Sequence, residues 1–310
     1  MATGSSNKTI YAAIAANLAI AITKFFAASI TGSSAMLSEG IHSVVDTGNE
    51  LVLLYGIRRS QRPPDENHPF GHGPELYFWT LVVAILIFAI GGGMSMYEGI
   101  THLINPSPPI EDPTWNYAVL GFVVVFEGFS WTVALKEFLP SMGNQNFWQA
   151  IKASKNPTIF TVLFEDSAAL LGLLVAFIGV LLGHLLKNPY LDGVASIVIG
   201  IILAVVAIIL ARESRGLLVG EGADPETVKQ LRSLILADPA VDHILRLLTL
   251  YFGHHEILLN LEIQFHQDLT IDDVTQAIDR LESSIQSDYP DIRNIFVEAK
   301  SLTRRKGQQI

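Results

Sequence analysis

The sequence predicts a helical membrane domain followed by a small soluble α+β domain. Half of the 310 residues are apolar and only 16% are charged, whereas an average soluble domain has about 25% charged residues. The apolar residues lie in long runs before residue 212, and from Glu213 onward the composition is that of a soluble protein. We therefore expect a membrane domain over residues 1–212 and a soluble domain over residues 213–310.

Six segments in the first part of the chain are each long enough to cross a bilayer as a helix, which takes about 20 apolar residues. Lipid offers the backbone no hydrogen-bond partners, and these runs lack the alternation of barrel strands, so we expect a bundle of six transmembrane helices. The first segment is interpreted as a retained helix rather than a signal peptide. The segments are Ile10–Ile30, Ser34–Tyr55, Leu76–Leu103, Tyr117–Phe138, Thr158–Leu186 and Leu191–Ala211.

The distribution of basic residues between the loops indicates the orientation of the bundle. Arg58, Arg59 and Arg62 follow the second segment, and further basic residues follow the fourth and the sixth. The loops on the opposite side carry Lys187 as their only basic residue. Because basic loops stay on the cytoplasmic side, we expect both termini in the cytoplasm.

The C-terminal part has the pattern α-β-β-α-β, which is typical of a small ferredoxin-like sandwich. Asp224 and Thr270 precede amphipathic segments and are suitable N-caps for two helices. The strands are bounded by polar residues and are rich in apolar side chains. The expected elements are the helix Pro225–Leu236, the strands His243–Phe252 and Glu256–Phe265, the helix Ile271–Ser287 and the strand Ile292–Ala299.

The composition excludes several functional classes. The chain has no cysteine, so any bound metal must be held by His, Asp, Glu or Asn. Its net charge of −10 argues against a nucleic-acid partner. It contains neither a His-Glu-x-x-His segment nor a Gly-x-Ser-x-Gly segment, which argues against a membrane hydrolase. We therefore do not expect an enzyme.

The second apolar segment contains the strongest cluster of polar residues. His42 and Asp46 are four residues apart and share one helical face, and Asn49 continues the same stripe. An imidazole and a carboxylate one turn apart are two of the ligands that a tetrahedral zinc site needs. Spacing alone equally allows a structural hydrogen bond between His42 and Asp46.

The fifth segment contains two adjacent carboxylates, Glu165 and Asp166. Neighbouring residues point about 100° apart on a helix, so only one of them easily faces the same point as His42 and Asp46. Carboxylates at this depth need a cation, a proton or a hydrogen-bonded pocket. A metal ion satisfies that need, and a protonated structural pair is the alternative.

Four more polar residues of the apolar segments have no assigned partner. They are Asn17, Lys24, Glu127 and Asp192. Ionisable groups in lipid are costly and usually functional, and each of these can hydrogen-bond between helices or take part in a proton path.

The loop after the second segment contains a further set of candidate metal ligands. Asp65, His68 and His72 lie within eight residues, and the glycines at 71 and 73 allow tight backbone turns. Loop histidines are often merely exposed, so the spacing is a weak signal by itself.

Together these motifs resemble those of the cation diffusion facilitator family of metal transporters. The stretch from Ser38 to Asp46 is similar to the family's helix-two motif, HxxxD or DxxxD, and the stretch from Asp65 to Gly73 is similar to the following loop. Glu165-Asp166-Ser167 lies where the family has its helix-five ligands. The resemblance covers nearly the whole chain and is greatest to the branch of mitochondrial-type zinc transporters and their bacterial relatives.

The resemblance implies a homodimeric efflux protein that exchanges Zn²⁺ for H⁺ by alternating access, most simply in a bacterial inner membrane. It places metal ligands at His42, Asp46 and Asp166. The family's first helix-five ligand falls on Val162, which cannot bind metal, so Glu165 or water would complete the site. It also implies a second metal site at the loop residues Asp65, His68 and His72.

The resemblance is weaker in the C-terminal part. His243 matches one of the family's ligand positions, but the others fall on residues that are poor ligands for a zinc cluster. We therefore expect this domain to form a dimer without the usual metal cluster. The poorly matching positions are Asn260, Thr275, Glu298 and Lys300.

Metal binding at the intramembrane residues must release protons, because imidazole and carboxylate bind metal only in their deprotonated forms. His42, Asp46 and Asp166 are therefore expected to couple protons to metal. An imidazole ligand favours zinc over harder cations, with Mn²⁺, Co²⁺, Ni²⁺ and Fe²⁺ as alternatives. A non-transporting membrane scaffold or sensor ordered by metal is the alternative of a different class.

Overall fold

The computed structural model describes residues 3–106, 113–142, 157–253 and 256–300. The chain divides into two compact units. The helical unit comprises Met1–Arg58 and Leu76–Arg215, and the C-terminal unit comprises Arg59–Glu75 and Gly216–Ile310. The loop 59–75, which carries one set of candidate ligands, therefore belongs with the C-terminal residues rather than with the helices that flank it.

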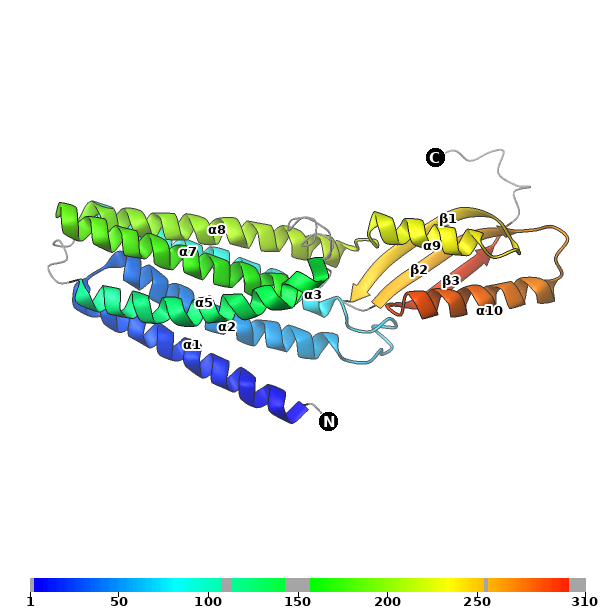
Figure 1. The fold of residues 1–310 in the computed structure, drawn as a ribbon, viewed down its shortest axis with the longest axis horizontal. Coiled ribbons are helices and arrows are strands. Elements are labelled where there is room, and N and C mark those ends of the chain that lie inside the picture. The colour runs from blue at the N-terminus through cyan, green and yellow to red at the C-terminus, as the bar shows by residue number, and fades with distance from the viewer. Residues whose placement is uncertain (1–2, 107–112, 143–156, 254–255, 301–310) are drawn as a thin grey trace. The chain divides into compact units, whose positions relative to one another are not determined.

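The helical unit is built from long helices that lie side by side (Figure 1). Their bounds agree closely with the apolar segments, although most continue beyond them, because a helix does not end where its apolar composition ends. The third segment is interrupted by one π-helical stretch. The elements are α1 (Thr3–Thr31), α2 (Ser34–Ser60), α3 (Glu75–Leu86), η1 (Ile87–Gly92), α4 (Gly93–Ile104), α5 (Thr114–Met142), α7 (Pro157–Leu186) and α8 (Tyr190–Val219).

Four helical stretches within the described residues are long and apolar enough to cross a membrane. In α1 the described apolar stretch, Asn17–Thr31, is shorter than a span, and α2 carries the acidic residues Glu39, Asp46 and Glu50. The polar residues that make α2 a candidate site thus also lower its hydropathy. The protein is an integral membrane protein with several apolar helices, and the six-helix count stays a prediction. The four stretches are Glu75–Ile104, Thr114–Pro140, Phe160–Leu186 and Tyr190–Val219.

Helix α8 approaches η1 and α4 through glycines. A Cβ atom added at Gly99 would lie 2.6 Å from the carbonyl oxygen of Gly193, and one added at Gly200 would lie 2.9 Å from that of Gly92. Both glycine pairs have a spacing of seven residues along their helix, so they lie on one face of it. Small residues of this kind let the backbones of membrane helices come into direct contact.

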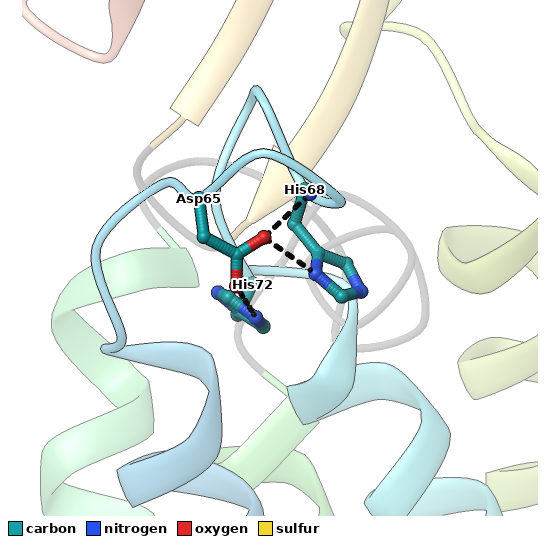
Figure 2. Close-up of side chains that lie close together, drawn as sticks. All are labelled: Asp65, His68 and His72. Atoms are coloured by element: carbon teal, nitrogen blue, oxygen red, sulfur yellow. Dashed lines mark hydrogen bonds and ion pairs between the residues drawn. The ribbon is translucent and has the colours of Figure 1, made fainter.

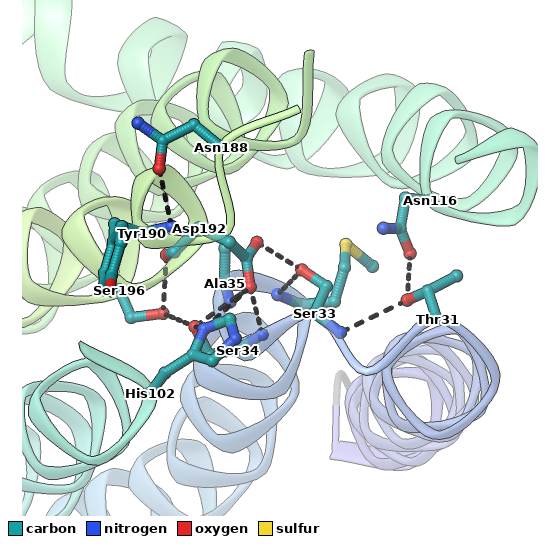
Figure 3. Close-up of polar contacts among 11 residues, drawn as sticks. Thr31, Ser33, Ser34, Ala35, His102, Asn116, Asn188, Tyr190, Asp192 and Ser196 are labelled. Atoms are coloured by element: carbon teal, nitrogen blue, oxygen red, sulfur yellow. Dashed lines mark hydrogen bonds and ion pairs between the residues drawn. The ribbon is translucent and has the colours of Figure 1, made fainter. Parts of the chain in front are cut away.

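The start of α2 is joined to α8 by a buried carboxylate (Figure 3). Asp192 accepts hydrogen bonds from Ser33 Oγ at 2.7 Å, from Ser34 Oγ at 3.0 Å, and from the backbone N–H groups of Ser34 and Ala35. His102 of α4 lies at the same point, with Nδ1 2.8 Å from Ser34 Oγ. A carboxylate from another helix therefore caps the first turn of α2, where negative charge is stabilised.

The C-terminal unit contains a three-stranded sheet with the strand order β1-β2-β3. Strand β2 pairs antiparallel with β1 and parallel with β3, and a helix connects β2 to β3. Asp224 and Thr270 cap the two helices as expected, the latter in a capping box with Asp273. The elements are α9 (Pro225–Leu236), β1 (Val241–Gly253), β2 (Glu256–Phe265), α10 (Ile271–Asp288) and β3 (Ile292–Ala299).

The core of the C-terminal unit lies between the sheet and its two helices. Alternate residues of β2, among them Leu259, Leu261 and Ile263, are fully buried and pack with Leu231 of α9 and Leu281 of α10. This period of two is that of a strand with one covered face. The described residues form an α+β domain with a three-stranded sheet, and its assignment as ferredoxin-like stays a prediction.

The loop 59–75 is anchored to the open side of this sheet. The ring of Phe70 stacks on Phe252 of β1 with centroids 5.0 Å apart and meets Phe296 of β3 edge-on at 6.4 Å. A Cβ atom added at Gly73 would lie 2.0 Å from the carbonyl oxygen of Phe252, so the two backbones are in contact there. Aromatic and backbone contacts thus fix the loop that carries Asp65, His68 and His72.

Candidate metal centres

The first candidate centre lies on one face of α2. Nδ1 of His42 lies 3.2 Å from Oδ1 of Asp46, and the imidazole is 1% exposed. Beyond this contact, neither of these two atoms has a hydrogen-bond partner within the described residues, and Nε2 of His42 has none there. Buried polar atoms are nearly always paired, and leaving one unpaired costs about 1–3 kcal/mol. A buried imidazole in contact with a carboxylate, and with its Nε2 free of protein partners, can take up a proton or bind a metal ion.

Helix α7 contributes the carboxylates of the first centre, but the two point to different neighbours. Oε1 of Glu165 accepts a hydrogen bond from Nδ2 of Asn49 on α2 at 2.8 Å. Oδ2 of Asp166 accepts one from Ser130 on α5 at 2.8 Å. The angle between adjacent helical residues thus turns Glu165 toward α2 and Asp166 toward α5.

The polar groups of α2, α5 and α7 nevertheless surround one region. Asp46 lies within electrostatic range of Glu165, Asp166 and Glu127. The ligand atoms of these residues and of His42 do not form a set within 4.8 Å of one another in the described part of the chain. Val162, at the place of a ligand in the family, packs against the hydrophobic core. The centre therefore has a shared acidic region but not the geometry of a bound ion.

Helix α1 adds a buried cation beside this region. Nζ of Lys24 lies 3.0 Å from Oε2 of Glu39 and 2.8 Å from Oγ of Ser43, and all three side chains are buried. Asn17 donates a hydrogen bond to Glu50 at 2.8 Å. The sequence showed Lys24 and Asn17 as polar residues within an apolar segment but did not identify their partners. Contacts between different helices cannot be derived from the spacing of residues along the chain.

The second candidate centre is the loop triad, Asp65, His68 and His72, shown in Figure 2. The carboxylate of Asp65 contacts both imidazoles, with Oδ1 3.0 Å from His68 Nδ1 and Oδ2 3.4 Å from His72 Nε2. Their ligand atoms all lie within 4.8 Å of one another. Among the described residues, no other group of three or more His, Asp and Glu side chains meets this limit.

The electrostatics of the loop triad favour a cation. The hydrogen bond from His68 lowers the pKa of Asp65 below its usual value of 3.8, and the backbone N–H groups of His68 and Asn67 lower it further. The carboxylate is therefore ionised at any physiological pH. Two imidazoles and one carboxylate provide three protein ligands and leave a fourth position open, the ligand number of a zinc site that exchanges a ligand.

The remaining residue predicted from the sequence, His243, belongs to the C-terminal unit and is not part of the loop triad. Its imidazole is 66% exposed, and Nδ1 lies 3.0 Å from Oδ1 of Asp242. The described residues place no third ligand beside this pair. Glu298 and Lys300 form an ion pair with each other at 3.1 Å. The sequence also predicts that His254 and His255 are exposed residues of a turn, and both lie outside the described residues.

Comparison with known protein sequences places this chain in a family. The family model for the cation efflux transmembrane domain matches residues 10–219. The "Proton-coupled zinc antiporter SLC30A9, mitochondrial" of Xenopus laevis is 30% identical over 94% of this chain and 59% of its own length. This chain therefore spans less than two thirds of that relative.

Two bacterial proteins match over nearly their whole length. The "Manganese efflux system protein MneP" of Bacillus subtilis is 25% identical over 94% of this chain and 95% of its own. The "Magnetosome protein MamB" of Paramagnetospirillum magneticum is 23% identical over 93% of this chain and 92% of its own. Since the family model covers more than half of the sequence, the chain belongs to the cation diffusion facilitator family of cation efflux proteins.

Proposed function

We propose that this protein exports a divalent metal ion across a membrane in exchange for protons, with Zn²⁺ as its main substrate. The single observation that carries the proposal is the buried His42, whose Nδ1 contacts Asp46 and whose Nε2 has no hydrogen-bond partner among the described residues. Ionisable groups buried between membrane helices are costly and usually functional. The named activity of the zinc antiporter relatives supports the same substrate.

The proposed transport site consists of His42 and Asp46 on α2 with Glu165 and Asp166 on α7. Asn49 holds Glu165 toward α2 by a hydrogen bond, and in this proposal the metal ion replaces Asn49 as the partner of Glu165. Protons and the metal ion compete for the same lone pairs at His42, Asp46 and Asp166, which makes the site itself the coupling device. Glu127, within electrostatic range of Asp46, belongs to the proton path in this proposal.

The rest of the proposal concerns the assembly. The protein works as a homodimer of chains with six transmembrane helices and a ferredoxin-like C-terminal domain, by alternating access and without enzymatic activity. Both termini lie in the cytoplasm, and the host membrane is a bacterial inner membrane. The loop triad binds a second Zn²⁺ that is not transported.

Manganese is the second candidate substrate. Five of the six groups in the region are oxygen donors (Asp46, Asn49, Glu127, Glu165, Asp166), and hard cations prefer oxygen. The relative of Bacillus subtilis that matches over 95% of its length is named a manganese efflux protein. Under this alternative His42 serves as a proton acceptor rather than a ligand.

A liposome flux experiment tests the proposal and separates these alternatives. The purified protein is reconstituted with an outward proton gradient, and uptake of Zn²⁺ and of Mn²⁺ is followed in parallel. We expect gradient-driven Zn²⁺ uptake that His42→Ala abolishes, because the site loses its nitrogen ligand. Undiminished Zn²⁺ uptake by the variant contradicts the site, and Mn²⁺ uptake in preference to Zn²⁺ favours the second candidate. A protein that folds and binds metal but carries no flux is the non-transporting scaffold.

A further inference from the structure

A lysine and a glutamate form an ion pair inside the helical unit, next to the proposed transport site. Lys24 and Glu39 are both 0% exposed, and their charged atoms lie 3.0 Å apart. Removing two charges from water costs several kcal/mol each, and a buried pair seldom returns more than that cost. The pair is therefore weak evidence for stability and better evidence for a role at the site.

The position of the pair on α2 connects it to the proposed ligands. Glu39 lies one turn before His42, and Ser43, which accepts the second hydrogen bond from the Lys24 ammonium group, is the residue next to His42. Glu39 and Ser43 are four residues apart, so the ammonium group bridges one turn of the helix beside the ligand His42. Lys24 also lies within electrostatic range of His42 and Asp46.

The charges around this region are strongly unbalanced. Asp46 lies among Glu127, Glu165 and Asp166, and the positive charge of Lys24 acts on Glu39, Asp46 and Glu127. A site with this many carboxylates and no cation of its own would bind a divalent ion tightly and release it slowly. A transport site has to bind and release in every cycle.

We propose that Lys24 is a resident cation that weakens the binding of the transported ion at His42 and Asp46 and so speeds its release. The inference rests on the proposed function and adds to it a residue that sets affinity without being a ligand. Glu39 and Ser43 hold the ammonium group in place, and Glu39 compensates its charge in the absence of metal. Gly172 of α7 packs against the carboxylate of Glu39, so that the pair is enclosed on its other side.

The test uses the opposite charges of the pair. Lys24→Met removes a positive charge beside the site, so we expect Zn²⁺ to bind at least about tenfold more tightly. Glu39→Gln removes a negative charge and should weaken binding by a similar factor. The double variant restores the charge balance and should return close to the wild-type affinity, which a double-mutant cycle measures directly.

Calorimetry with Zn²⁺ alone on the whole protein in detergent gives the affinities. All variants carry Asp65→Ala and His72→Ala to silence the loop triad, and gel filtration confirms that each is folded. Lys24→Arg keeps the positive charge beside the site, so it should bind Zn²⁺ more weakly than Lys24→Met does. In liposome flux, Lys24→Met should lower both KM and kcat, because it slows release.

A purely structural pair predicts a different pattern. In that case Lys24→Met and Glu39→Gln change the Zn²⁺ affinity in the same direction, and this outcome overturns the inference. The proposed transport site is judged separately: it stands if His42→Ala abolishes Zn²⁺ binding. If Lys24→Met fails to fold, two other variants are compared instead. One is the double variant Lys24→Gln with Glu39→Gln, and the other is Glu39→Gln alone. The double variant must then bind Zn²⁺ more tightly than the single one. Unchanged Zn²⁺ binding in His42→Ala removes the proposed site and the role of Lys24 together.

Discussion

At the scale of single residues, the protein handles buried charge in two ways. Lys24 and Glu39 neutralise each other at 3.0 Å, and Asp192 is satisfied by several donors at the start of α2. His42 and Asp46 instead contact each other at 3.2 Å, with no cation beside them in the same ion pair, and Nε2 of His42 has no hydrogen-bond partner among the described residues. Since Oε1 of Glu39 also lacks a hydrogen-bond partner there, what distinguishes His42 and Asp46 as candidate ligands is an imidazole next to a carboxylate in a region with further carboxylates.

Asp65 provides a pH-dependent prediction at the same scale. Its pKa is lowered below the usual value by the hydrogen bond from His68, so its contribution to stability is complete above about pH 4 and is lost as the pH falls through the lowered pKa. In the presence of a chelator, wild type should have a higher Tm than Asp65→Asn at pH 6, and the difference should shrink toward pH 3. A difference that grows on acidification contradicts the assigned contact.

Among elements, the glycine contact of α4 and α8 decides how closely these two helices pack. Gly99→Val places side-chain atoms where the carbonyl oxygen of Gly193 now lies, since even a Cβ would be 2.6 Å away. We expect the thermal stability of the whole protein to fall by several degrees. Gly121→Val in α5 is the matched control, because a Cβ there meets no atom within 4 Å. Equal effects of the two substitutions would show that the contact is unimportant.

The loop 59–75 provides the second prediction for an element. Phe70 lies between the ligands His68 and His72 in sequence, and its ring packs on Phe252 and Phe296. Phe70→Ala should raise amide hydrogen exchange across the loop and weaken Zn²⁺ binding to the triad, because an aromatic pair contributes about 0.5–1.5 kcal/mol beyond burial. Phe70→Leu keeps part of the apolar contact, so its hydrogen exchange and its Zn²⁺ affinity should lie between those of the wild type and Phe70→Ala. Loop exchange that stays at the wild-type rate argues against the anchor.

At the scale of the whole molecule, the two candidate centres lie in different units. Zn²⁺ bound at one centre should therefore stabilise its own unit independently of Zn²⁺ bound at the other. A ligand at 100 times its Kd stabilises the folded state by about 2.7 kcal/mol. We expect Zn²⁺ to raise the Tm of the wild type and a chelator to reverse this. His72→Ala should remove the part of the Tm increase that comes from the loop triad. His42→Ala should remove the part that comes from the helical site, and the two losses of Tm should be additive. Loss of the entire effect in either single variant would mean that the centres act as one.

The sequence by itself predicted most of the secondary structure and the residues of both centres. Helices such as Thr158–Leu186 and Pro225–Leu236 could be recognised because helical periodicity, span length and capping residues are local properties of the chain. The triad Asp65, His68 and His72 was also visible, since its members are close in sequence. Its preformed geometry was not, because that depends on the docking of Phe70 onto the sheet.

Only the tertiary structure decided which polar groups meet. It paired Lys24 with Glu39, Asn49 with Glu165 and Ser130 with Asp166, and it separated the two adjacent carboxylates of α7 onto different neighbours. Spacing along a helix determines the direction of a side chain relative to its own helix but not what stands opposite. That is decided by how helices distant in sequence pack together, and here the packing placed a lysine beside the proposed metal site.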